Sequence, residues 1–145
     1  MGLKLKTAEK IFLDTAPFIY YFEEHPAYIS KLKALFDNVY EMKTPVITSM
    51  ITYIELLTYP EKTGAKKLAA KYRDSLTTSE LISIYPLDFH IADISVKLRA
   101  KHNLKTPDAI QVATAIASGS DYLITNDRKL KKIKTTVPVL LTSEI

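Results

Sequence analysis

Short apolar runs alternate along this chain with longer amphipathic segments, and no other feature of the sequence constrains the fold as strongly. The runs that predict strands, each five or six residues long, are 10–14, 45–49, 81–86, 121–125 and 137–141. None of them alternates strictly between apolar and polar residues, so we expect each to be buried on both faces, which is typical of parallel sheets. The pattern therefore predicts a mostly parallel sheet of five strands.

The segments between the expected strands have the 3.6-residue periodicity of amphipathic helices. The predicted helices are 26–42, 49–59, 61–76, 88–102 and 106–118, with a break near Pro60 between the second and the third. The last of them has Thr106 at the expected N-cap, Pro107 at the first helical position and Gly119 beyond its end. Because a repeated strand–helix–strand order places helices on both faces of a parallel sheet, residues 1–145 are expected to form one α/β domain with three layers, α/β/α.

Composition narrows the chemistry that such a domain could perform. The 145 residues include no cysteine, which excludes disulfide scaffolds, cysteine nucleophiles, zinc knuckles and iron–sulfur sites. The three histidines, at positions 25, 90 and 102, do not have the spacing of metal ligands on one helix. Carboxylates are therefore the main chemical equipment. Twenty Lys and Arg against sixteen Asp and Glu give a net charge of +4, which permits a polyanionic partner without requiring one.

Signals for export or membrane insertion are not expected in this chain. The first ten residues lack the apolar run of a secretory leader, and no stretch approaches the roughly 18 apolar residues of a membrane span. We therefore expect a cytoplasmic protein without a membrane segment.

Four acids fall where such a sheet is expected to bind a ligand, because parallel α/β sheets bind ligands at the carboxyl ends of their strands. Asp14 and Asp127 follow the first and fourth expected strands, and Asp108 lies in the first turn of the helix that begins near Thr106. Glu55 lies among apolar residues of the helix that follows the second strand. The sequence predicts that these carboxylates meet at one end of the sheet.

A cluster of carboxylates predicts a bound cation, because carboxylates repel one another unless a positive charge compensates them. Mg²⁺ and Mn²⁺ prefer oxygen ligands. One or two such ions can lower the pKa of a bound water, orient it for in-line attack and stabilise the leaving oxygen. An acidic metal site in a basic chain therefore favours hydrolysis of phosphodiesters, with lysines around the site holding the flanking phosphates.

Each acid taken singly also has a structural explanation. Asp14 can cap the next helix, Asp108 can complement the dipole of its helix, and Asp127 can begin a turn or cap a short following helix. Asp121, before the fourth strand, is expected to be structural. Only Glu55 is left without such an explanation. The prediction of a site therefore depends on the coincidence of the four acids.

These acids lie in segments that together resemble the PIN-domain nucleases. The matching segments are FLDT at 12–15, TYIEL at 52–56, TPDAIQVATAI at 106–116 and YLITNDRKL at 122–130. The third segment followed by the fourth is the most specific part, and the resemblance covers nearly the whole chain. The length is similar to that of the VapC-type toxins of bacterial and archaeal toxin–antitoxin pairs.

The resemblance implies a ribonuclease that depends on Mg²⁺ or Mn²⁺ and has a PIN-like fold. Asp14 would be the central metal ligand, and Asp108 would be a ligand on the opposite side. Glu55 and Asp127 would bind the metal directly or through water, or position the attacking water. The supporting residues would be Thr15, Thr125 and Asn126, the last two holding the orientation of Asp127 through hydrogen bonds. The expected partners are RNA as substrate, a cognate antitoxin protein, and a second copy of the chain in a homodimer or higher homo-oligomer.

The sequence departs from the family pattern at two places. Lys129 and Leu130 stand where many relatives carry a further acid, so a fifth carboxylate is not expected. Ala16 and Pro17 follow Asp-Thr in place of the frequent Ser or Asn. The second departure touches the edge of the expected pocket and leaves the four acids intact.

Basic and aromatic residues offer candidate contact surfaces. The group that directly follows the fourth acid is expected to bind RNA phosphates: Arg128, Lys129, Lys131 and Lys132. A second group is better explained as a solvated helix face: Lys62, Lys66, Lys67, Lys71 and Arg73. The aromatic-rich segment 17–22 leaves three roles open, namely packing, an oligomer contact or an antitoxin contact.

Other functions remain open on the sequence alone. A phosphatase or phosphotransfer domain could use Asp14 as a nucleophile, but Ala16 stands where a haloacid-dehalogenase-type motif needs a second Asp. A receiver-like domain needs an acceptor Asp at the end of the third strand, where Pro86 stands. An RNA-binding or scaffold domain without catalysis, or a PIN nuclease of RNA processing that is not a toxin, also fits, because fold does not fix chemistry.

Overall fold

Five short strands form one parallel sheet. In the computed structural model, which describes residues 2–145, the strands are β1 (Ile11–Leu13), β2 (Val46–Ser49), β3 (Ile82–Tyr85), β4 (Tyr122–Thr125) and β5 (Val139–Leu141). Their order across the sheet is β3-β2-β1-β4-β5, and every neighbouring pair is parallel. The predicted sheet is therefore confirmed, and it is parallel throughout.

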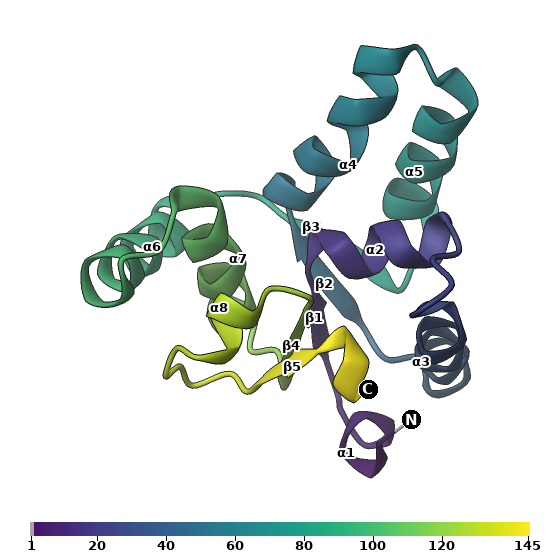
Figure 1. Cartoon of the computed structure of the whole chain (residues 1–145). Coiled ribbons are helices and arrows are strands. Elements are labelled where there is room, and N and C mark those ends of the chain that lie inside the picture. The colour runs from purple at the N-terminus through teal and green to yellow at the C-terminus, as the bar shows by residue number, and fades with distance from the viewer. Residues whose placement is uncertain (1) are drawn as a thin grey trace.

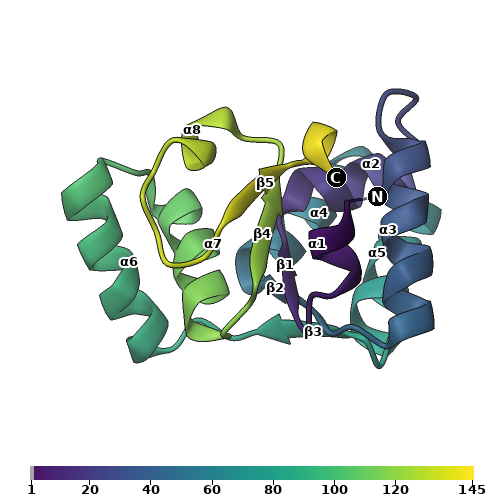
Figure 2. The same cartoon turned by 90° about the horizontal axis from the view of Figure 1, so that it is seen from below.

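Helices cover both faces of the sheet, as Figures 1 and 2 show. On one side lie α2 (Thr15–Phe22), α3 (Ile29–Met42), α4 (Met50–Thr63) and α5 (Lys66–Thr78), and on the other lie α6 (Phe89–His102) and α7 (Thr106–Ala117). The short elements are α1 (Leu3–Lys6), α8 (Arg128–Lys131) and the 3₁₀ helix η1 (Thr142–Glu144). This is the predicted three-layer α/β/α architecture.

The central strands are apolar on both faces because each face packs against a separate core. Ile11 and Leu13 of β1 belong to the core beneath α2–α5, and Phe12 between them belongs to the core beneath α6 and α7. These three side chains are at most 1% exposed. In β4 the alternation repeats, since Leu123 packs toward α6 and α7 while Ile124 packs toward the opposite side. The continuous apolar runs of the sequence follow from this two-sided burial.

The strand order reverses at β1, which places the carboxyl ends of several strands around one point. The chain leaves β1 to form β2 on one side, whereas β4 pairs with the other side of β1. Such a reversal is where open α/β sheets bind ligands. Asp14 follows β1, Ser49 ends β2 at the start of α4, and Asn126 and Asp127 follow β4. The fold therefore brings the expected site residues to one edge of the sheet.

The structure contains a helix, α2, that the sequence pattern does not predict. Its segment is rich in aromatic residues, which favour strands and hide the helical periodicity. Pro17 is accommodated in the first turn, where backbone N–H groups have no helical acceptor in any case. The rings of Tyr21 and Phe36 lie 4.1 Å apart between centroids, and those of Phe22 and Tyr72 lie 5.4 Å apart. Of the roles left open for segment 17–22, packing is thus confirmed.

Several predicted helix boundaries are wrong, since the helix predicted from 26 begins at Ile29 and the one predicted from 61 begins at Lys66. The expected break at Pro60 does not occur, because α4 continues through this buried proline to Thr63 and ends where Gly64 takes a positive φ of 70°. The N-cap of α7 is Lys105 and not Thr106, which is instead the first helical residue. Within residues 2–145, no helix combines the length and hydrophobicity that a membrane span requires.

Candidate active site

Asp14 is held by hydrogen-bond donors from three parts of the chain. Its Oδ1 accepts from the backbone N of Thr15 and from Nε2 of Gln111, both at 2.8 Å, and its Oδ2 accepts from Oγ1 of Thr125 at 2.7 Å. The bond from Thr15 is the N-cap of α2, so the capping role considered for Asp14 is confirmed. Because the same carboxylate also contacts α7 and β4, capping and a place in a site do not compete. Its direction is fixed by the fold before any ligand binds.

Glu55 projects from the second turn of α4 toward the same site. Its Oε1 accepts a long hydrogen bond, 3.4 Å, from Oγ1 of Thr15. Desolvation raises the pKa of Glu55 above 4.5, and the negative charges of Asp14 and Asp108 raise it further, whereas the hydrogen bond from Thr15 lowers it. Glu55 is nevertheless an exposed residue, whereas Asp14, Asp108 and Asp127 are half-buried. Glu55 is therefore the acid of the group that is most accessible to a substrate.

Asp108 and Asp127 complete the acidic group from the opposite side. Desolvation raises the pKa of Asp108, followed by the charges of Asp127 and Asp14, while Lys129 and Lys105 lower it. Asp127 accepts a hydrogen bond from the backbone N of Lys129 at 2.9 Å and caps α8. The cap considered for Asp127 is thus confirmed. The interactions of Asp108 with both neighbours show that the acids lie within electrostatic reach of one another.

The acidic group has the donor chemistry of a site for a hard divalent cation. Each of its oxygen ligands would be a carboxylate, and desolvation together with repulsion from neighbouring acids already raises the pKa of Glu55 and Asp108. In the described part of the chain, no group of three or more His, Asp or Glu side chains is placed so that it could hold a metal ion on its own. Mg²⁺ does not need one, because it is commonly held by one or two carboxylates together with waters and phosphate oxygens. The residues therefore fit such an ion.

The three predicted supporting residues lie at the site, with one difference from expectation. Thr15 links Asp14 to Glu55, as described above. Thr125 accepts a hydrogen bond from the backbone N of Asp127 at 3.0 Å while its hydroxyl donates to Asp14. Asn126 does not hold Asp127, since its Nδ2 donates to Oη of Tyr20 at 2.9 Å. Asn126 therefore ties the loop after β4 to α2 and not to the neighbouring acid.

The predicted RNA-binding residues divide into two kinds. Lys129 is close enough to Asp108 to lower the pKa of that acid. Lys131 is committed to the C-terminal segment, because its Nζ donates to the carbonyl of Val139 at 2.8 Å and to Glu144 at 3.0 Å. Arg128 and Lys132 are exposed and have no ion pair or side-chain hydrogen bond in the described structure. These two residues and Lys129 are thus the ones available to a phosphate.

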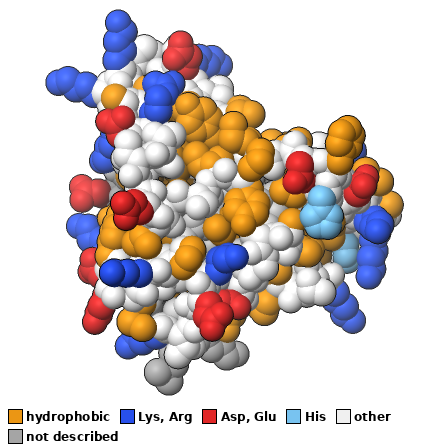
Figure 3. All heavy atoms as spheres, turned by 180° about the vertical axis from the view of Figure 1, so that it is seen from behind, with side chains coloured by type: hydrophobic (Ala, Val, Ile, Leu, Met, Phe, Trp, Pro, Cys, Tyr) orange, Lys and Arg blue, Asp and Glu red, His pale blue; other side chains and the backbone are white. Residues whose placement is uncertain are grey.

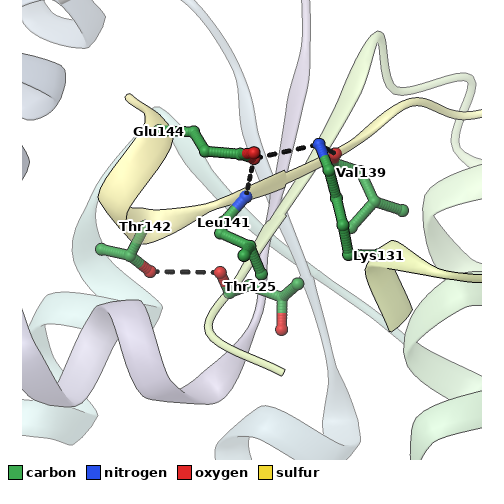
Figure 4. A network of polar contacts seen from close by, with 6 residues as sticks. All are labelled: Thr125, Lys131, Val139, Leu141, Thr142 and Glu144. Carbon is green, nitrogen blue, oxygen red and sulfur yellow. Dashed lines mark hydrogen bonds and ion pairs between the residues drawn. The ribbon is translucent and has the colours of Figure 1, made fainter. Parts of the chain in front are cut away.

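A polar network at the C-terminal end of the described chain fixes the back of β4 (Figure 4). Glu144 accepts hydrogen bonds from Lys131 at 3.0 Å and from the backbone N of Leu141 at 2.7 Å, and the latter bond is the larger cause of the lowered pKa of Glu144. Oγ1 of Thr142 donates to the carbonyl of Thr125 at 3.2 Å. Thr125, which donates a hydrogen bond to Asp14, is therefore itself held in place by the last strand and the turn that follows it.

The structure reveals polar site residues that the sequence interpretation missed. Gln111 of α7 is only 2% exposed and contacts Asp14, Ser49 and Thr52 through its side-chain amide. Thr52 is fully buried and also accepts a hydrogen bond from Thr15 at 3.3 Å. One sequence signal could have identified Gln111, because it is an amide in the middle of a helix that is otherwise apolar over 109–113.

Asp121 has the structural role that was predicted for it. Its Oδ2 accepts hydrogen bonds from the backbone N of Glu9 at 2.7 Å and of Lys10 at 3.0 Å, which holds the entry to β1 against the entry to β4. These contacts lie at the amino ends of the strands, away from the acidic group. Asp121 therefore serves as a natural comparison for the four acids of the site.

Apolar side chains gather on the face opposite to that of Figure 1, as Figure 3 shows. Met50, Ile54 and Leu87 are each at least 41% exposed and line one shallow pocket, and Leu87 shares a second with Phe89, which is 91% exposed. Basic side chains gather where the α4–α5 hairpin projects. In that second basic group, Lys71 donates to the carbonyl of Phe22 and Arg73 donates to the hydroxyl of Tyr53.

Comparison with protein families and curated sequences gives one match. The family described as "PIN domain" matches residues 11–135. This range contains all four acids, Gln111, and the strands β1 to β4. No curated protein matches the chain.

Among the solved structures with the same fold are proteins of bacterial toxin–antitoxin systems. A toxin–antitoxin complex from Klebsiella pneumoniae is 28% identical, with 93% of this chain and 99% of that chain covered and a TM-score of 0.68. VapBC2 from Rickettsia felis, bound to a DNA fragment from its promoter, is 19% identical, with 91% and 98% covered and a TM-score of 0.70. VapC20 from Mycobacterium tuberculosis, a toxin that cleaves the sarcin–ricin loop, is 16% identical, with 88% and 99% covered and a TM-score of 0.65.

Proposed function

Since this chain belongs to the PIN domain family, we propose that it is an endoribonuclease that hydrolyses phosphodiester bonds of RNA and depends on Mg²⁺ or Mn²⁺. The observation that carries the proposal is the convergence of Asp14, Glu55, Asp108 and Asp127 from four separate segments at the carboxyl ends of the strands, where Thr15 hydrogen-bonds to both Asp14 and Glu55. A structural role for each acid does not require that they be neighbours. Their convergence at the carboxyl ends of the strands favours a ligand site.

Asp14 would hold the metal ion, with Asp108 on the opposite side and Glu55 and Asp127 in direct contact or linked through water. When bound, such an ion lowers the pKa of a coordinated water and neutralises charge on the scissile phosphate. It would also offset the repulsion that raises the pKa of Glu55 and Asp108. The acidic group is thus suited to a cation by its charge as well as by its ligands.

The side chains around the metal would divide the remaining work. Glu55 is exposed and has a raised pKa, so its carboxylate is suited to accept a proton from the attacking water. Asp14, with its direction fixed by three donors, would set the position of the ion. Arg128, Lys129 and Lys132 would hold the phosphates that flank the scissile bond.

We further propose that the protein is the toxin of a type II toxin–antitoxin pair that acts in the cytoplasm, with a cognate antitoxin as partner and a homodimer as its assembly. The K. pneumoniae complex, 28% identical to this chain, supports the antitoxin partner. The exposed apolar group of Met50, Ile54, Leu87 and Phe89 supports an assembly, because clusters of large exposed apolar side chains often mark interaction sites between proteins. Light scattering after size exclusion measures the mass, and co-purification with the product of an adjacent reading frame tests the partner.

Cleavage of a structured RNA by the purified chain tests the activity. We expect cleavage with Mg²⁺ or Mn²⁺, its arrest by EDTA, and its loss in both Asp14→Asn and Asp108→Asn. Asp121→Asn is the matched control, since it changes an acid that lies at the amino ends of the strands. Cleavage by both site variants at the rate of the parent would show that the assigned site is wrong.

Calorimetry distinguishes this proposal from an RNA-binding domain without catalysis. We expect Mn²⁺ to bind the parent and to bind Asp14→Asn much more weakly. A protein that binds RNA but shows no Asp14-dependent binding of Mn²⁺ would favour the non-catalytic alternative.

A further inference from the structure

We propose that Gln111 is a positioning residue of the metal site, which holds Asp14 through its side-chain amide, and that Ser49 acts through Gln111 by stabilising the orientation in which the amide nitrogen faces Asp14. The inference rests on the proposed function, since it concerns how Asp14 is presented to a cation. Gln111 lies 97 positions after Asp14 in the chain and reaches it directly from α7.

The hydrogen bonds of Gln111 are fully assigned by chemistry. A carboxylate accepts but does not donate, so the group that faces Asp14 at 2.8 Å must be the amide nitrogen. The second proton of the same nitrogen is donated to Oγ1 of Thr52, also at 2.8 Å. The amide oxygen then faces Ser49, whose hydroxyl donates to it. The nitrogen and the oxygen of the amide therefore cannot exchange places.

Ser49 reinforces the orientation of the amide that the carboxylate of Asp14 requires. Its Oγ accepts the N-cap hydrogen bond from the backbone N of Ile51 at 3.1 Å, so its own proton is directed at Gln111. If the amide were reversed, its oxygen would face the carboxylate of Asp14, and its nitrogen would compete with the hydroxyl proton of Ser49. The end of β2 thus stabilises the orientation of a side chain on α7, which in turn stabilises the orientation of an acid after β1.

Burial makes this arrangement expensive to replace by water. Gln111, Thr52 and Ser49 are 2%, 0% and 1% exposed. A buried polar group without a partner costs about 1–3 kcal/mol, so such groups are nearly always bonded. The surrounding residues of α7, including Ala109, Val112 and Ala113, are fully apolar and buried. A purely structural helix would be served as well by an apolar residue at 111.

The same group of side chains also connects Asp14 with Glu55. Thr52 accepts from Gln111 and from Oγ1 of Thr15, and the Thr15 hydroxyl also lies 3.4 Å from Oε1 of Glu55. Gln111 therefore stabilises the relative placement of two acids that electrostatics alone would drive apart. Without the amide, Asp14 is expected to be held less firmly. The other three acids, Glu55, Asp108 and Asp127, are expected to remain in the site.

The experiment compares Gln111→Met with Thr114→Val, which lies one turn further along α7. Methionine has nearly the length of glutamine but no donor, so it removes the contacts to Asp14, Thr52 and Ser49 without opening a large cavity. Thr114 is 1% exposed and donates only to the carbonyl of Ile110 in its own helix, so its variant reports the effect of losing a buried polar bond away from the acids. Mn²⁺ affinity by calorimetry, kcat and KM for RNA, and thermal unfolding without metal are measured for each.

For Gln111→Met we expect Mn²⁺ affinity and kcat to fall by about 10–100-fold, which is the usual effect of residues that orient metal ligands. KM for RNA should remain within about twofold, because Gln111 is buried and does not touch the substrate. Thr114→Val should keep the parent's Mn²⁺ affinity. Parent-like Mn²⁺ affinity and kcat in Gln111→Met, with only a lower melting temperature, would show that Gln111 is structural and would overturn the inference.

A double-mutant cycle tests the part assigned to Ser49. Ser49→Ala alone should weaken Mn²⁺ binding less than Gln111→Met does, and it should have no further effect on Mn²⁺ affinity when added to Gln111→Met. Additive losses of affinity would show that Ser49 does not act through Gln111. Failure of the proposed function is distinguishable, because the parent itself would then bind no Mn²⁺ or Asp14→Asn would bind it as tightly.

Discussion

The carboxylates of this protein occupy two contrasting environments. In the acidic group at the strand ends, burial and neighbouring acids raise the pKa of Glu55 and Asp108. In the C-terminal network, the hydrogen bonds from Leu141 and Lys131 lower the pKa of Glu144. The folded structure therefore disfavours the charge of the first two acids and favours the charge of the third.

This difference separates acids that serve folding from acids that do not. Glu144 is paired with a cation and with a backbone N–H, so its ionised form stabilises the folded chain. Glu55 and Asp108 have no ion pair within 4.0 Å in the described residues. A bound divalent ion would reverse their contribution, because it supplies the positive charge that the chain itself does not bring there. Until a cation binds, the charges of the acidic group therefore destabilise the folded chain, and other interactions must compensate for this.

The largest effect is expected from Asp14→Asn, which tests whether the acidic group is functional at all. We expect RNA cleavage to fall by more than about a hundredfold, because removing the proposed metal ligand would forfeit about 3 kcal/mol or more of transition-state stabilisation. Single-turnover cleavage with excess enzyme measures this loss. Glu144→Gln is the control from the other environment and should cleave within about twofold of the parent.

Asp108→Asn is expected to have opposite effects on activity and on stability. Cleavage should fall, while the melting temperature without metal should rise by about 1–3 °C, because a neutral amide removes the repulsion from Asp127 and Asp14. Differential scanning calorimetry in EDTA measures the shift. Addition of Mn²⁺ should stabilise the parent more than the variant. A lower melting temperature in EDTA would contradict the idea that this acid opposes folding.

Glu144→Gln is expected to lower stability by a small amount at neutral pH. The variant loses the negative charge that strengthens the hydrogen bond from Leu141 and pairs with Lys131, although partial exposure to solvent weakens the ion pair. A fall in melting temperature of about 1–2 °C is expected. Lys131→Met, which removes the same ion pair from the other side, should lower it similarly. Equal stability of Glu144→Gln and the parent at pH 7 would remove the contrast between the two environments.

The smallest effect is the pH dependence of these differences in metal-free protein. Because the pKa of Glu144 is lowered in the folded state, its contribution is present above the ordinary value of 4.5 and is lost as the pH falls through the lowered pKa. Because the pKa of Asp108 is raised, its contribution is present below the ordinary value of 3.8 and is lost as the pH rises through the raised pKa. Urea unfolding between pH 3 and 7 should therefore show the deficit of Glu144→Gln shrinking toward acid pH. The gain of Asp108→Asn should shrink in the same direction.

The sheet could be predicted from the sequence because burial on both faces leaves a local record. Leu13 and Ile124, like their neighbours in the strands, are apolar because they are buried between the sheet and the helices. The apolar runs in the sequence therefore identify the strands. The four acids could be predicted for a similar reason, since Asp14 and Asp127 immediately follow strands and the topology determines where strand ends lie. Position relative to an element is local information.

Contacts between distant parts of the chain could not be predicted. Sequence spacing indicates on which face of a helix or strand a residue lies, but not which residue it contacts there. Gln111 is visible in the sequence as a polar residue in an apolar helix, yet nothing local identifies Asp14 or Ser49 as its partners. The helix α2 was missed because its aromatic side chains are selected by packing against Phe36 and Tyr72, which are distant in sequence. The predicted helix break at Pro60 is wrong for the same reason, since burial of this proline in the tertiary structure outweighs its local tendency to end a helix.

The strand order has a consequence for when the site can exist during synthesis. Asp14 lies on the central strand, but two of its three donors come from Gln111 and Thr125, which follow it by 97 and 111 residues. Thr125 is in turn anchored by Thr142, in the turn after β5. A ribosome that is still translating this chain therefore carries a growing polypeptide in which the hydrogen bonds around Asp14 are incomplete until the last strand has emerged and docked.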